Sequence, residues 1–156
     1  MIKQPIAGRG RSMLNMTSFI VPGEPVPKAR PRVTRNGRTY TPKKTTDYEK
    51  LVRASYEEQA GKYFGDGPLM CRISLYFPIP KSYGKRKTER IFDKKILYTK
   101  KPDIDNCVKA ILDALNGIAY KDDSQVISII ASKDYVKGME SDGHIPCAVV
   151  KIFEVL

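Results

Sequence analysis

Histidine and cysteine are scarce in this sequence, and their scarcity excludes several kinds of enzyme. The single histidine, His144, rules out zinc hydrolases that need two or three histidine ligands. It lies in a Gly/Asp/Pro turn, where we expect a surface loop residue rather than a general base. The three cysteines contain no CxxC pair, so neither a disulfide framework nor a zinc site is expected, and a reducing cytoplasm is the natural setting.

Long apolar stretches are missing as well. No apolar run is long enough to span a membrane, and residues 1–16 lack the apolar segment and cleavage site of a signal peptide. We interpret residues 1–16 as a flexible leader and residues 17–156 as one domain, since compact domains commonly contain about 100 to 150 residues. No pattern in the sequence indicates an organic cofactor.

Positive charge, in contrast, is in excess. The chain has 28 Lys and Arg against 17 Asp and Glu, a formal net charge of +11, which indicates an anionic partner such as nucleic acid. Residues 28–44 hold seven basic residues and no acid, and residues 81–101 hold nine basic residues and two acids.

Hydrophobic periodicity predicts an α+β domain, a mixed β-sheet with its helices packed on one face. The expected strands are residues 17–27, 69–80, 125–136 and 146–155, and the expected helices are residues 47–62 and 103–116. Asn36-Gly37 favours a hairpin with a type I′ turn. Residues 81–101 are either a short basic helix or a mobile loop.

Both expected helices carry local signals. Thr46 and Glu49 have the spacing of a capping box, and Asn116-Gly117 is a typical helix end. The residues predicted on the inner face of helix 47–62 are Tyr48, Leu51, Val52, Ser55 and Tyr56. The predicted core stripe of helix 103–116 is Ile104, Val108, Ile111, Leu112 and Leu115.

Five acids gather within residues 103–123, directly after the most basic stretch: Asp103, Asp105, Asp113, Asp122 and Asp123. This pattern is typical of a site where carboxylates hold a divalent cation while nearby lysines and arginines hold a polyanion. Mg²⁺ prefers oxygen ligands, and it can both polarise a phosphoryl oxygen and activate a bound water. We predict a Mg²⁺ site formed by Asp103 and Asp105 at a strand-to-helix junction, with Asp122 or Asp123 as a third ligand.

Lys109 lies on the polar stripe of the same helix, where a lysine can stabilise the extra negative charge of a phosphate in the transition state. Purely structural roles are the alternatives for these residues. Asp103 can be an N-cap, Lys109 and Asp113 an i,i+4 ion pair, and Asp122-Asp123 a solvated turn.

The segment KPDIDNCVKAILDALNGIAYKDDSQV (101–126) resembles the signature of the RusA family of Holliday-junction resolvases, which many phages and prophages carry. The shared features are D-x-D-N, a lysine four residues after the second Asp, an Asp-Ala-Leu and a D-D-x-Q-hydrophobic turn. Upstream, GEPVPKARPRVTRNGRTYTPKKTTDYE (23–49) resembles the N-terminal segment of phage-type members.

The resemblance implies a homodimeric, Mg²⁺-dependent endodeoxyribonuclease that makes paired nicks in four-way DNA junctions during recombination and repair. Mn²⁺ is expected to substitute for Mg²⁺. The basic side chains that would then contact the phosphates of the junction arms are Arg30, Arg32, Arg35, Arg38, Lys43, Lys44, Lys85, Arg86 and Lys87. Asp103, Asp105 and Asp123 match the essential aspartates of the family, with Asp122 as a neighbouring candidate, and Lys109 matches its active-site lysine. The apolar strand 148–155 is our candidate dimer interface, with a core strand of the monomer as the alternative. Two other functions stay open, a nuclease for flaps or forks and a non-catalytic DNA-binding protein.

Overall fold

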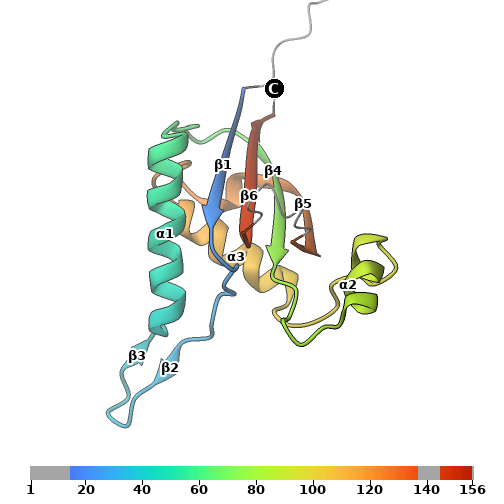
Figure 1. The fold of residues 1–156 in the computed structure, drawn as a ribbon. Coiled ribbons are helices and arrows are strands. Elements are labelled where there is room, and N and C mark those ends of the chain that lie inside the picture. The colour runs from blue at the N-terminus through green and yellow to red at the C-terminus, as the bar shows by residue number, and fades with distance from the viewer. Residues whose placement is uncertain (1–14, 137–144, 156) are drawn as a thin grey trace, which may run out of the picture.

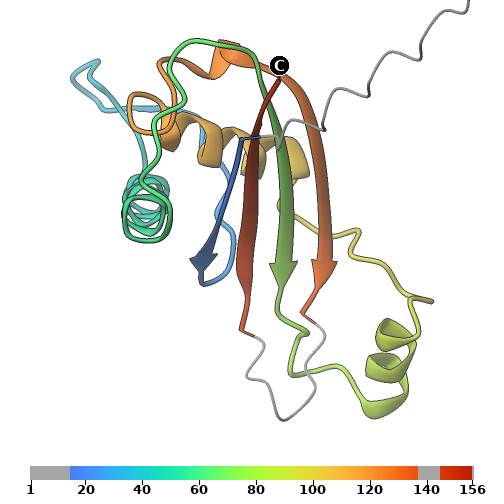
Figure 2. The same ribbon diagram turned by 90° about the horizontal axis from the view of Figure 1, so that it is seen from above.

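The computed structural model describes residues 15–136 and 145–155 of the chain. A four-stranded sheet in the order β1-β6-β4-β5 carries α1 and α3 on one face (Figures 1 and 2). The sheet strands are β1 (Met16–Pro22), β4 (Leu69–Phe77), β5 (Val126–Tyr135) and β6 (Cys147–Glu154). The helices are α1 (Lys43–Gln59), α2 (Lys85–Phe92), α3 (Ile104–Leu115) and the short 3₁₀ helix η1 (Asp123–Gln125). A mixed sheet with helices on one face confirms the predicted α+β class.

The connection between β4 and β5 positions the acidic residues. β6 pairs antiparallel with both β1 and β4, whereas β4 and β5 run parallel. A parallel pair needs a long crossover, and here residues 78–125 provide it, with α2 and α3 inside. The predicted acidic site and the basic stretch 81–101 therefore lie in one continuous connection.

The alternation along β4 agrees with the prediction. Leu69, Ile73 and Phe77 are buried in the core that the sheet forms with α1 and α3, as are the residues between them at the same period. The intervening side chains of β4 point to the other face, which α1 and α3 do not cover (Figure 2). Within residues 15–136 and 145–155, no helix covers this second face, which we call the open face of the sheet.

The start of α1 differs from the prediction. The helix begins at Lys43 rather than at residue 47, after Pro42, whose φ of −53° already suits a helix. Thr46 lies inside the first turn and donates to the carbonyl oxygen of Lys43 at 2.9 Å, so the capping box is wrong. Tyr48, Val52, Ser55 and Tyr56 are buried as predicted. Leu51 is 37% exposed at the border of that stripe, and its assignment to the inner face is wrong.

The predicted hairpin is present, but its turn is of another type. β2 (Arg32–Val33) and β3 (Thr39–Tyr40) pair antiparallel, and Thr34 N donates to Arg38 O at 2.8 Å. The loop therefore has three residues, with Gly37 at a φ of +74°. A type I′ turn needs positive φ at both central residues, and among the described residues Lys94 alone combines a side chain with positive φ. The predicted type I′ turn is therefore wrong. A three-residue loop that ends in a glycine with left-handed backbone conformation takes its place.

The remaining elements agree closely with the sequence. α3 has Asp103 as its N-cap residue and ends at Asn116, followed by Gly117 at a φ of +79°. Within residues 81–101, the short basic helix is the alternative that the structure shows, as α2. β1 ends at Pro22, five residues earlier than predicted. None of the described helices is long and apolar enough to cross a membrane. His144 and most of the predicted leader lie outside the described residues.

The burial of α3 generates a stability prediction. Ile111 is fully buried against the sheet, so Ile111→Ala should lower the free energy of unfolding by about 2–5 kcal/mol. Leu51→Ala, at the exposed border of α1, should cost less than about 1 kcal/mol. Urea unfolding followed by circular dichroism measures both. Equal losses would contradict the assignment of the two positions.

Candidate active site

One face of α3 carries the charged residues of the site. Asp105, Lys109 and Asp113 follow at intervals of four, so that they lie above one another along the helix. The opposite face is apolar and buried in the core, with Val108, Ile111 and Leu115 among its members. Burial of that stripe against the sheet forces the charged row outward.

The 3₁₀ helix η1 brings Asp123 to this face. The Asp122 carboxylate accepts a hydrogen bond from Ser124 N at 3.2 Å, and the Gln125 side chain accepts one from Asp122 N at 2.9 Å, a reciprocal capping box. Gln125 Nε2 also donates to the carbonyl oxygens of Gly65 and Gly67, both at 2.9 Å. Asp122 and Gln125 therefore have structural roles in the D-D-x-Q motif, while Asp123 faces α3.

Asp123 faces the carboxyl group of Asp113. Burial raises the pKa of Asp123, and the hydrogen bond and charge repulsion from Asp113 raise it further, whereas Lys109 acts in the opposite direction. Lys109 Nζ lies 3.7 Å from Asp113, the i,i+4 ion pair that the sequence allowed. The carboxyl groups of Asp113 and Asp123 lie within hydrogen-bonding reach of each other. Two carboxyl groups in such a position favour a proton or a cation between them.

Lys28, which the sequence did not single out, binds the same cluster. Its ammonium lies 3.1 Å from Asp113 of α3 and also forms an ion pair with Glu49 of α1. Burial alone would lower the pKa of Lys28, but the hydrogen bonds to Glu49 and Asp113 outweigh it and the pKa is raised. The backbone of this segment is anchored too, because Lys28 N donates to Asn106 O at 2.8 Å. No local pattern marks Lys28, since its partners lie in distant elements.

Asp103 occupies a different position at the start of α3. Lys101 Nζ contacts both of its carboxylate oxygens, at 2.7 and 2.8 Å, and this bond lowers the pKa of Asp103, as does the charge of Lys133. The Asp103 side chain makes no capping hydrogen bond, which argues against a mere N-cap. Lys133 of β5 donates to the carbonyl oxygens of Lys100 and Pro102, at 2.7 and 3.0 Å, and so holds the loop that leads into α3.

The structure therefore brings together Asp113, Asp123 and Lys109, and places Asp103 and Asp105 at the other end of α3. Asp105 and Asp113 are eight residues apart, about 12 Å along the helix axis. In the described part of the chain, no three Asp, Glu, His or Cys side chains lie close enough to hold a metal ion, so the predicted convergence of Asp103, Asp105 and Asp123 is not seen.

The chemistry of these side chains does fit a hard divalent cation. The ligands are carboxylate oxygens, and the repulsion between Asp113 and Asp123 is of the kind that a cation relieves.

The predicted DNA-binding residues lie in two groups. Arg30 lines a hollow with Lys28, Asn106 and Lys109, next to the acidic face. The hairpin carries Arg32, Arg35 and Arg38, and Lys43 and Lys44 open α1. Lys85, Arg86 and Lys87 form the first turn of α2. The hairpin and α2 project on opposite sides of α3 (Figures 1 and 2), so basic groups flank the acidic face.

The pair of carboxyl groups predicts a gain in stability on substitution. Because the folded-state pKa of Asp123 is raised, its ionised form costs stability at neutral pH, and this cost disappears as the pH falls through that pKa toward the unfolded value of about 3.9. Asp123→Asn should therefore raise the free energy of unfolding at neutral pH, on the order of 0.5 kcal/mol, and lose the gain in acid. Thermal melts across this pH range measure it.

Asp122→Asn is the matched control, because asparagine caps a helix as well as aspartate does and Asp122 already has hydrogen-bond partners. This variant should show no gain at neutral pH. A loss of stability in Asp123→Asn would contradict the facing carboxyl groups.

Comparison with known proteins identifies the family of this chain. The family model for Endodeoxyribonuclease RusA matches residues 22–141, which include α3, η1 and both basic groups. The chain is also similar to the "Uncharacterized protein YqaN" of Bacillus subtilis (strain 168), with 37% identity over 127 residues, 78% of this chain and 89% of that protein. The family model covers well over half of the sequence and confirms the resemblance carried by residues 101–126. The chain therefore belongs to the RusA family of endodeoxyribonucleases, which hydrolyse phosphodiester bonds and resolve Holliday junctions.

Proposed function

We propose that this protein is a Mg²⁺-dependent resolvase that cuts four-way DNA junctions at the charged face of α3. The observation that supports the proposal most is the row of Asp105, Lys109 and Asp113, with Asp123 beside it, flanked on both sides by basic groups. The basic groups attract the DNA and the acids suit a cation. A DNA substrate also supports a place of action in the cytoplasm of a bacterium or a phage-infected cell.

Asp103, Asp105 and Asp123 are the residues that would hold Mg²⁺, or Mn²⁺ in its place. Asp122 is the weaker candidate because its carboxylate caps η1. Asp103 is available despite its ion pair, since the Lys101 side chain is 83% exposed and exposed pairs contribute little stability. When bound, the ion supplies Lewis-acid polarisation and a water of lowered pKa.

The other roles belong to basic side chains. Lys109 is 61% exposed and lies between Asp105 and Asp113 on α3, where its ammonium can reach a phosphate and stabilise developing negative charge. Arg30, beside Lys109, and the hairpin arginines would hold the DNA arms through their phosphates, contacts that position DNA without reading its sequence.

Membership in an endonuclease family favours cleavage over DNA binding alone. We also propose that the protein prefers four-way junctions to flaps and forks. Cleavage rates on the three substrates measure this preference.

We further propose that the active form is a symmetric homodimer. A four-way junction has two equivalent strands to cut, and a two-fold axis supplies two related sites from one gene. The candidate strand 148–155 is largely β6, whose two edges pair with β1 and β4 and whose Ala148, Val150 and Ile152 are buried. The alternative of a core strand in the monomer is therefore confirmed for β6.

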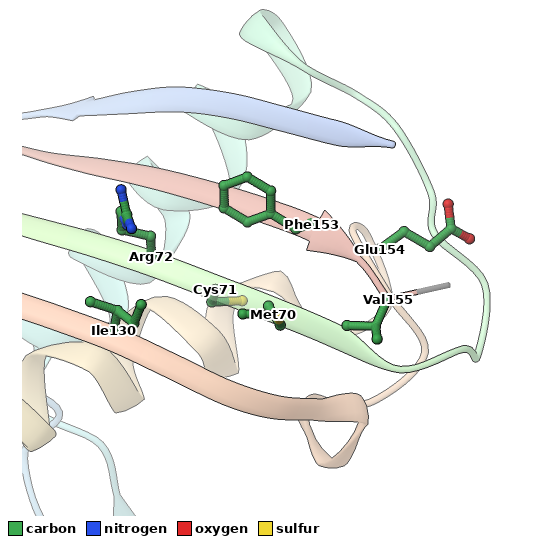
Figure 3. Close-up of a pocket in the computed structure, with 7 residues that line it drawn as sticks. All are labelled: Met70, Cys71, Arg72, Ile130, Phe153, Glu154 and Val155. Carbon is green, nitrogen blue, oxygen red and sulfur yellow. The ribbon is translucent and has the colours of Figure 1, made fainter. Parts of the chain in front are cut away.

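The open face of the sheet is the better candidate for the interface. Met70 of β4, Ile130 of β5 and Phe153 of β6 line a groove there together with Arg72 and Val155 (Figure 3). Ile130 is 52% exposed and Met70 37% exposed. Exposed apolar surface that the monomer leaves uncovered commonly marks a protein interface.

Cleavage of a mobile synthetic junction, a flap and a fork tests the catalytic proposal. Asp105→Asn should abolish Mg²⁺-dependent nicking while junction binding persists or strengthens, because the variant removes a ligand and a repulsive charge together. Lys109→Ala should slow nicking by about 10²–10³-fold. Glu58→Gln, at the far end of α1, is the control and should cut normally.

Mg²⁺ binding gives a second readout that needs no activity. An ion that binds the folded state should raise the melting temperature of the wild type and have little effect on Asp105→Asn. An Asp105→Asn protein that nicks at the wild-type rate would refute the site.

Sedimentation or light scattering tests the dimer. The wild type should have twice the chain mass of 17.6 kDa at micromolar concentration, and Ile130→Asp should shift it to the monomer because a buried, unpaired charge disfavours the interface. Leu97→Asp, at a 63% exposed position outside the sheet, is the control. A monomeric wild type that still makes paired cuts would overturn the model.

A further inference from the structure

Four aromatic side chains gather where β4 and β5 end. The Phe77 ring stacks on Tyr98 with centroids 4.5 Å apart, and Tyr98 meets Tyr135 at 4.9 Å. Tyr83 extends the row at 6.5 Å from Tyr135. Phe77 and Tyr135 are buried, whereas Tyr83 is partly exposed next to α2. The row thus leads from the core to the surface.

Lysines from separate elements surround the outer end of this row. Lys87 Nζ of α2 lies 3.6 Å from the ring centroid of Tyr83, and Lys100 Nζ lies 4.7 Å from it. Lys133 Nζ of β5 lies 5.3 Å from the ring of Tyr98. Three ammonium groups therefore converge on two tyrosines.

The phenol of Tyr83 responds to this charge. Its hydrogen bond with Lys100, followed by those with Tyr135 and Lys87, lowers the pKa of Tyr83 to about 8. The pKa of Tyr98, in contrast, is raised by burial and then by the negative charge of Glu24. A phenol whose ionised form is favoured indicates a position with an excess of positive charge, which is where an anion binds.

This cluster is connected to the start of α3. The carbonyl oxygen of Lys100 accepts from Lys133 at 2.7 Å, and the adjacent Lys101 pairs with Asp103. Lys100 and Asp103 are three residues apart, at most about 10 Å of chain. That span equals the rise of about three nucleotides along a DNA strand.

We propose that Tyr83, Lys87 and Lys100, with the buried Tyr135 hydrogen-bonded to Tyr83 behind them, form a binding site for a backbone phosphate of the DNA, within a few nucleotides of the phosphate that is cut. The inference rests on the proposed function for its ligand. Ammonium and phenol groups bind non-bridging phosphate oxygens without regard to sequence. The site would fix the position of the strand relative to Asp103 and Asp105.

Binding of an anion should raise the pKa of Tyr83, because a protonated phenol donates a hydrogen bond to phosphate and an ionised one repels it. NMR of protein labelled with ¹³C at the tyrosine ζ carbon follows this titration, with inorganic phosphate or junction DNA as probe and without divalent ions. Tyr83→Phe should lose the transition near pH 8. Tyr63→Phe, at a 54% exposed position elsewhere, should keep it.

Junction affinity provides the independent measurement. Lys100→Gln should weaken binding on the order of 3- to 10-fold and reduce the log–log salt slope by about 0.9, as expected for one lost phosphate contact. Lys62→Gln is the matched control, because Lys62 Nζ also lies over an aromatic ring, 4.6 Å from the centroid of Phe64, but outside this cluster. It should bind like the wild type.

The outcomes separate this inference from the proposed function. If the wild type cuts junctions while DNA leaves the pKa of Tyr83 unchanged, or Lys100→Gln binds like Lys62→Gln, the phosphate site is wrong and the resolvase stands. If inorganic phosphate shifts the pKa but no junction is bound, the proposed function and the DNA assignment of this site are both refuted.

Discussion

The ion pairs of Lys28 hold the site in place. One ammonium joins Glu49 on α1 to Asp113 on α3, and the backbone beside it is bonded to Asn106. The segment that carries the arginine-rich hairpin is therefore attached to the helix that carries the acids. Without this cation, carboxylates from two helices would face each other with no charge between them, and the position of the hairpin relative to α3 would be poorly defined.

The same interaction makes the two facing carboxyl groups unequal. Asp113 contacts both Lys28 and Lys109, so two cations lie beside its carboxylate. Asp123 forms no ion pair with another described residue, and burial together with the neighbouring Asp113 raises its pKa. Acidic groups thus stay concentrated within a strongly basic surface. Such a basic surface can attract DNA over a distance, as expected of an endodeoxyribonuclease.

The sequence was informative wherever the signal is local. The alternation along β4 and the apolar stripe of α3 predicted which faces are buried, because side-chain direction follows from the period of each element. The clustering of acids in one segment is likewise a local signal, and of these acids the structure brings Asp113 and Asp123 together. Two of the predictions that were wrong concern the start of α1 and the type of the hairpin turn, which depend on adjacent residues and on strand pairing. Pro42 rather than Thr46 starts α1, and the hairpin register gives the Asn36-Gly37 turn an extra residue.

Long-range partners explain what the sequence could not show. Lys28 was only one of seven basic residues in segment 28–44 until the fold placed Glu49 and Asp113 beside it. Tyr83 carried no signal, since its neighbours come from α2, β5 and the loop before α3. The position of Asp123 beside Asp113 rather than beside Asp105 likewise depends on where η1 docks, which spacing along the chain does not reveal.

The strand order has a consequence for how the protein is made. β1 pairs only with β6 in the sheet, and β6 also separates β1 from β4, although more than a hundred residues of sequence divide β1 from β6. On the ribosome β1 therefore has no sheet partner until β6 has emerged, and closing such a distant contact slows folding. The sheet that supports α3 is completed only then, so a nascent chain that already bears all five acids of residues 103–123 still lacks the finished scaffold that positions them.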